Sequence, residues 1–71
     1  MRKMMGKHEH VVPRANGKWA VKSEGSTKAS KIFDKKYEAE DYGEMLAIKG
    51  RSCNKIHDKN SVIREVHCWH W

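Results

Sequence analysis

Two short runs of strand-forming residues, Val11-Val12 and Trp19-Ala20-Val21, flank the dipeptide Asn16-Gly17, and this arrangement constrains the fold most. Asn-Gly is the strongest short-range signal for a β-hairpin, because both residues tolerate the positive φ of a type I′ turn. Pro13 has no amide hydrogen to donate, so it places the first strand at a sheet edge or ends it. We therefore expect a hairpin whose first strand begins near His10.

The next stretch carries signals for a third strand and one helix. Gly25-Ser26-Thr27 favours a turn, and Lys28–Phe33 alternates in the manner of a strand. We expect Asp34 to be the N-cap of a helix over Lys35–Lys49, with Gly50 as its left-handed C′ residue. The first three strands then form an antiparallel meander.

One face of the predicted helix is apolar and the other is acidic. At helical spacing, the apolar stripe consists of Ala39, Tyr42, Gly43 and Leu46. Because Ala39 and Gly43 are small, we expect the helix backbone to approach Trp19 and Val21 closely. The stripe predicts a helix packed on the sheet.

A second hairpin is expected from Cys53–His57 and Val62–Trp69, around turn-forming residues 58–61. A turn centred on residues 59 and 60 places Cys53 opposite Val66, so Cys68 is a diagonal neighbour and a disulfide fits poorly. The predicted fold class is α+β: a three-stranded antiparallel meander, one amphipathic helix packed on it, and a C-terminal β-hairpin, in the order β-β-β-α-β-β.

The length of 71 residues allows one domain with a thin core, which makes a dimer worth considering. We expect residues 1–9 to be a flexible basic leader and residues 10–71 a single small domain. No apolar stretch approaches the ~20 residues that span a bilayer, so we expect no membrane association and a cytoplasmic location. The two cysteines would remain thiols there.

The net charge of +6 is unevenly distributed along the chain and suggests an anionic partner. Residues 1–31 carry eight lysines and arginines against two acids, and residues 34–44 carry five acids against two lysines. Residues 49–71 are basic again. The alternative interpretation is that the lysines form an ordinary solvated surface.

Several of these segments together carry a resemblance. They are His10-Val11-Val12-Pro13, Trp19-Ala20-Val21-Lys22, Asp34 heading a helix with Glu38-Ala39, and the late run 60–65. The chain thereby resembles a small bacterial family catalogued as domain of unknown function 2188, from His10 to about Glu65. It departs at the last turn, where the family usually has Asp-Gly, and it continues past the usual end. The resemblance implies a fold and no activity.

A more distant similarity concerns nucleic acids. The segments Gly17–Ala20, Phe33-Asp34 and Glu38-Ala39 with Tyr42 are similar to the DNA-binding domain of plant ethylene-response factors and the arm-binding domain of phage integrases. In those folds the sheet face away from the helix lies in the major groove.

The same similarity implies that this face binds DNA or RNA here. The alternative is that its lysines are only the solvent-exposed side of a half-buried sheet. Strand alternation places Trp19 and Val21 on the helix side, so that Lys18, Ala20 and Lys22 face outward. Most contact arginines and tryptophans of the plant domain are absent, and lysine contacts phosphates rather than bases, so low sequence specificity is expected. Arg14 and one or both of Lys28 and Lys31 are expected to join this face, so the candidate contact residues are Arg14, Lys18, Lys22, Lys28 and Lys31.

The sequence predicts neither a catalytic nor a metal site. Along a strand, Cys53 and His57 lie about 13 Å apart, and adjacent residues point to opposite faces. His67, Cys68 and His70 are weak candidate ligands that require the tail to leave the strand. No nucleophile has an oriented base, and no glycine-rich phosphate loop occurs, so we expect no enzyme, no cofactor and no small-molecule substrate.

The C-terminal residues favour a second kind of binding. Trp69 and Trp71 either cover the core or contact a partner, and Ile48 lies off the helix stripe as a candidate dimer contact. Our main hypothesis is a small basic non-catalytic module of a bacterium or phage that binds nucleic acid through the face opposite the helix. The alternative is a protein-interaction or homodimeric module that uses the terminal hairpin and the tryptophan-rich tail.

Overall fold

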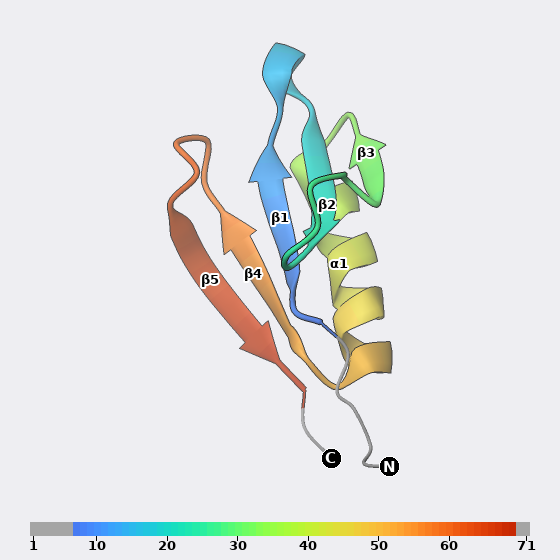
Figure 1. The fold of residues 1–71 in the computed structure, drawn as a ribbon. Coiled ribbons are helices and arrows are strands. Elements are labelled where there is room, and N and C mark those ends of the chain that lie inside the picture. The colour runs from blue at the N-terminus through green and yellow to red at the C-terminus, as the bar shows by residue number, and fades with distance from the viewer. Residues whose placement is uncertain (1–6, 70–71) are drawn as a thin grey trace.

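The computed structural model describes residues 7–69, in which one helix covers a single face of a five-stranded sheet (Figure 1). The elements are β1 (Glu9–Pro13), the 3-10 turn η1 (Ala15–Gly17), β2 (Trp19–Ser23), β3 (Lys31–Phe33), α1 (Lys36–Gly50), β4 (Cys53–His57) and β5 (Ile63–Cys68). The predicted α+β class and element order are confirmed. Among the described residues, no helix is long and apolar enough to cross a membrane.

The strands lie in the order β3-β2-β1-β4-β5, and the pairing of β1 with β4 is parallel. All other neighbouring strands are antiparallel. The meander and the C-terminal hairpin therefore form one mixed sheet. Strands β1 and β3 run in the same direction, because both are antiparallel to β2. The crossover through α1 then starts β4 in the direction of β3, which makes β4 parallel to β1.

The first hairpin has the predicted turn. Asn16 and Gly17 have φ angles of 65° and 74°, and the amide of Arg14 donates to the carbonyl of Lys18 at 2.7 Å. Pro13 was expected either to mark an edge strand or to end its strand. It ends β1, which lies in the middle of the sheet.

The core lies between the sheet and α1. Val11, Val21, Ala39 and Ile56 form its buried cluster, and Trp19, Phe33, Tyr42 and Leu46 pack around it. The apolar stripe of the helix and the inward orientation of Trp19 and Val21 are thus confirmed. Large side chains surround the small buried ones, which suits a chain too short for a thick core.

Gly43 packs against Asn54 and not, as expected, against Trp19 and Val21. A Cβ at this position would lie 2.6 Å from Oδ1 and 3.0 Å from Nδ2 of Asn54. Asn54 is only 2% exposed, and its Nδ2 donates to the carbonyl of Glu40 at 3.3 Å. The glycine therefore makes room for a buried amide on β4, not for Trp19 and Val21.

The helix begins and ends one residue later than predicted. Lys35 is the N-cap, without a side-chain bond, and Arg51 rather than Gly50 adopts the left-handed conformation, with φ at 53°. The prediction of Asp34 as the N-cap is wrong, because its carboxylate accepts a hydrogen bond from Lys18 Nζ at 2.6 Å instead. The third strand is also shorter than expected and begins at Lys31.

The fold includes residues that we assigned to the leader. Glu9 is part of β1 and is buried, and the Cys53 amide donates to Nδ1 of His8 at 3.0 Å. Ser52 Oγ donates to the carbonyl of Lys7 at 3.1 Å. Lys7, His8 and Glu9 therefore belong to the folded domain, and residues 1–6 lie outside the described part.

The second hairpin has a different register from the predicted one. Cys53 lies directly opposite Cys68, and the two form a disulfide, so the expectation of free thiols in a poorly matched register is wrong. Asp58 explains part of the shift. Its Oδ1 accepts hydrogen bonds from the amides of Asn60 and Val62, which widens the loop, and a bulge between Ile56 and His57 adds a further residue.

Asp58 holds this loop as a carboxylate. The hydrogen bond from the Val62 amide, followed by the bond from Arg64, lowers the pKa of Asp58 from 3.8 to about 2. Ser61, in the same loop, has a φ of 63°. This left-handed conformation is one that glycine adopts more readily than serine.

We expect Gly43→Ala to destabilise the protein. Exchanging a mid-helix glycine for alanine ordinarily stabilises by about 0.5–1 kcal/mol. Here the new methyl must displace the Asn54 amide, so we expect the free energy of unfolding in urea to fall by about 1–3 kcal/mol. The loss should shrink when the exchange is made in an Asn54→Ala background, and a more stable Gly43→Ala protein would contradict the assigned contact.

We also expect removal of the disulfide to cost stability. The two cysteines are 15 residues apart, and closing a loop of that size is worth about 3 kcal/mol. The double variant Cys53→Ser/Cys68→Ser should lose roughly this free energy of unfolding. Reduced wild-type protein should match the variant, which itself should not respond to reductant; equal stability of oxidised wild type and variant would refute the cross-link.

Candidate functional site

The candidate site is the sheet face opposite α1, which we call the open face. Because partners in a ladder point to the same side, the register separates these residues from those that pack on the helix. The open face consists of His10, Val12, Ala20, Lys22, Ile32, Cys53, Lys55, His57, Ile63, Val66 and Cys68. The connection between β2 and β3 crosses in front of β2 on this side (Figure 1).

The five predicted contact residues do not gather at one place. Lys22 lies on the open face, opposite His10 in the ladder, and Arg14 and Lys28 are exposed in the connections at either end of β2. Lys18 is paired with Asp34. Of Lys28 and Lys31, Lys31 does not join this face, since it pairs with the core residue Val21.

Other details of the face also differ from expectation. The Lys31 ammonium lies on the helix side, 5.4 Å from the ring centre of Phe33 and 5.6 Å from that of Tyr42. Ala20 lies on the open face as expected, but it is only 1% exposed. The open face therefore carries fewer of the predicted basic residues than the sequence pattern suggests.

A chain of hydrogen bonds crosses the open face and was not predicted from the sequence. Nε2 of His10 lies 2.9 Å from Oε1 of Glu24, and Nδ1 of His10 lies 3.0 Å from Nε2 of His57. Nδ1 of His57 is 3.2 Å from the carbonyl oxygen of Ser61. The chain thus links the β2–β3 connection, β1, β4 and the β4–β5 loop.

Glu24 is the acidic end of this chain. The hydrogen bond from His10 and, after it, the charge of Lys55 lower the pKa of Glu24 below its ordinary 4.5. Lys55 Nζ lies 3.4 Å from Oε1, the same oxygen that contacts His10. Glu24 therefore remains a carboxylate at neutral pH and offsets one positive charge of the face.

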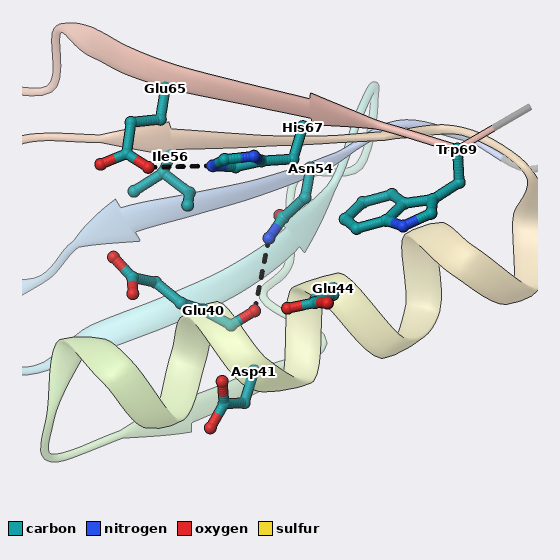
Figure 2. Close-up of a pocket in the computed structure, with 8 residues that line it drawn as sticks. All are labelled: Glu40, Asp41, Glu44, Asn54, Ile56, Glu65, His67 and Trp69. Carbon is teal, nitrogen blue, oxygen red and sulfur yellow. Dashed lines mark hydrogen bonds and ion pairs between the residues drawn. The ribbon is translucent and has the colours of Figure 1, made fainter.

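An acidic pocket lies on the helix side of the sheet. Between α1 and the β4–β5 hairpin lies a pocket of about 330 Å³ (Figure 2). Its lining residues are Glu40, Asp41, Glu44, Asn54, Ile56, Glu65, His67 and Trp69. Four carboxylates thus surround this pocket, and the sheet separates it from the open face.

The comparisons with known proteins identify the family. Residues 9–67 match the model of DUF2188, described as an uncharacterized protein conserved in bacteria. The chain belongs to this family. The match runs from the first residue of β1 to the last-but-one residue of β5, and it confirms the resemblance that rests on segments between His10 and Glu65.

Neither the search of curated proteins nor that of solved structures found a match to this DUF2188 protein. The similarity to the ethylene-response-factor and integrase domains therefore stays a prediction. The family description assigns no activity, so the function has to be argued from the surface itself.

Two of the three candidate partner contacts of the DUF2188 protein, Trp69 and Ile48, lie in the described part of the chain. Trp69 is half-buried, its side chain lines the acidic pocket, and its amide donates to the Ser52 carbonyl at 3.1 Å. Ile48 is half-buried and borders a shallow hollow with Met45. Trp71 lies outside the described residues.

The weak metal candidates do not converge in the described part. Cys68 is held in the disulfide, and His67 lies on the other face, with Nε2 2.9 Å from Oε1 of Glu65. His70 lies outside the described residues. Within residues 7–69, no three metal-binding side chains form a cluster.

Proposed function

We propose that this DUF2188 protein is a non-catalytic module that binds the phosphate backbone of a nucleic acid with its open face. The sorting of charge across the sheet carries the proposal. Lys22 and Lys55 lie on the open face, where the Glu24 carboxylate contacts Lys55 and His10, while four carboxylates line the pocket on the helix side. A polyanion is attracted to the first side and repelled by the second.

The chemistry of the open face favours phosphate contacts over reading of bases. Lysine is a point charge on a flexible stem, whereas guanine is best recognised by the fork of an arginine. Arg14 lies beyond the end of β1, at the tip of the first hairpin. We therefore expect low sequence specificity, and the choice between DNA and RNA becomes an outcome of the binding test.

Lys22→Glu should weaken binding without unfolding the protein. The measurement is fluorescence anisotropy of labelled duplex DNA, single-stranded DNA and duplex RNA. A face with about three phosphate contacts should lose roughly 40-fold in affinity between about 50 and 200 mM salt. Removing one contact should reduce the slope of log K against log salt by about 1.

Lys49→Glu is the matched control, because it makes the same charge change in the last turn of α1, on the other side of the molecule. Wild-type binding and an intact Lys49→Glu affinity, with weak Lys22→Glu binding, would support the open face. Equal losses in both variants would show a response to net charge alone. No binding at low salt would refute the proposal.

A homodimer is the second candidate, and the exposure of β5 favours it. All six residues of this edge strand are exposed, and Ile63 and Val66 are 45% and 51% accessible. An unpaired edge with apolar side chains is a template for pairing with another strand. Under this alternative, two copies of β5 join their sheets.

Val66→Lys should dissociate such a dimer, because it places a charge at the centre of the new strand pair. Light scattering during size-exclusion chromatography should then show wild-type protein at twice 8.3 kDa and the variant at 8.3 kDa. Ile32→Lys, the same kind of change on the opposite edge strand β3, should leave the dimer intact. A monomeric wild type would exclude this candidate.

The cytoplasmic location remains a prediction. The Cys53–Cys68 disulfide counts against it, because disulfides persist in oxidising compartments and are rare in the cytosol. Labelling of free thiols in intact cells would decide the matter: protected cysteines would contradict a reducing location.

A further inference from the structure

We propose that His10 and His57 together form a site for one proton, and that this proton strengthens the hold of the open face on phosphates. The second half of this inference rests on the proposed nucleic-acid binding. The first half, the proton site itself, depends only on the hydrogen-bond chain that the two histidines share.

The number of protons follows from the partners at both ends of the chain. The Ser61 carbonyl and the Glu24 carboxylate are acceptors, so Nδ1 of His57 and Nε2 of His10 must both carry hydrogens. The contact of 3.0 Å between the two rings requires a third hydrogen on one of the facing nitrogens. Two neutral imidazoles hold only two such hydrogens, so the complete chain contains one additional proton and one positive charge.

The groups around the pair suit a single added charge. Glu24 approaches His10 from the β2–β3 connection, Lys55 from β4 shares that carboxylate, and Lys22 of β2 stands opposite His10 in the ladder. From β5, the open face receives Val66 and, opposite His57, Ile63. One carboxylate thus supports the first proton, whereas a second would bring two imidazolium rings together beside two lysines.

Loss of the proton would change both the structure and the charge of the face. One of the three hydrogen bonds must then break, and Lys55 is left as the cationic partner of Glu24. Histidine is the side chain that ordinarily changes charge between about pH 5 and 8. The open face should therefore gain one positive charge as the pH falls through this range.

The proton site is tested in the free protein by NMR of the histidine ring nitrogens between about pH 5.5 and 8. We expect the pair to take up one proton, with three ring N–H groups at the lower pH. His67→Gln removes an exposed histidine of the other face and simplifies the assignment. Two neutral rings at the lower pH, or uptake of two protons by the pair, would overturn the site.

The effect on binding is tested by the same anisotropy assay at constant ionic strength. Wild-type affinity for duplex DNA should rise about two- to fivefold from pH 7.5 to 5.5, the effect of one exposed charge. The double variant His10→Gln/His57→Gln should lose this pH dependence, and His67→Gln should retain it.

The outcomes separate the two proposals. Binding with the same pH dependence in wild type and double variant would overturn the regulation and leave nucleic-acid binding in place. Absence of binding at every pH would overturn nucleic-acid binding and its regulation, while the NMR count would still decide whether the proton site exists.

Discussion

The parallel pairing of β1 with β4 is the contact on which the rest of the structure depends. It joins the N-terminal meander to the C-terminal hairpin and makes β1 the middle strand of the sheet. It places Ile56 beside Val11 in the core and, on the other face, Lys55 beside His10. Both the hydrophobic cluster and the candidate binding face therefore exist only when residues more than 40 positions apart have met.

The thin core explains why polar groups take structural positions. Asn54 lies beneath α1, where Gly43 leaves room for its amide, and Ser52 ties the end of the helix to the chain before β1. Hydrogen bonds of this kind hold a small domain in one arrangement, since an unmade bond in a buried site costs more than a made bond gains. The disulfide between β4 and β5 adds a covalent constraint at the edge of the sheet.

The packing of α1 on one face of the sheet also keeps the candidate binding face apart from the acidic residues of the helix. Because α1 covers one face only, the acidic residues of the helix and the open face lie on opposite sides of the sheet. The acidic pocket beside α1 therefore lies on the opposite side of the sheet from Lys22 and Lys55.

Local chemistry was sufficient to predict the α+β class, the Asn16-Gly17 turn, the amphipathic helix and the family, because each depends on neighbouring residues and their periodicity. The N-cap, the cysteine register and the histidine pair could not be predicted. Asp34 could cap the helix or bind Lys18, and only the folded chain brings Lys18 within reach. The hydrogen bonds of Asp58 set the length of the loop, and this length contributes to the register in which Cys53 lies opposite Cys68. The sequence by itself determined which strands and helix form; only the tertiary structure decided which side chains meet, because strand pairing joins residues that no periodicity connects.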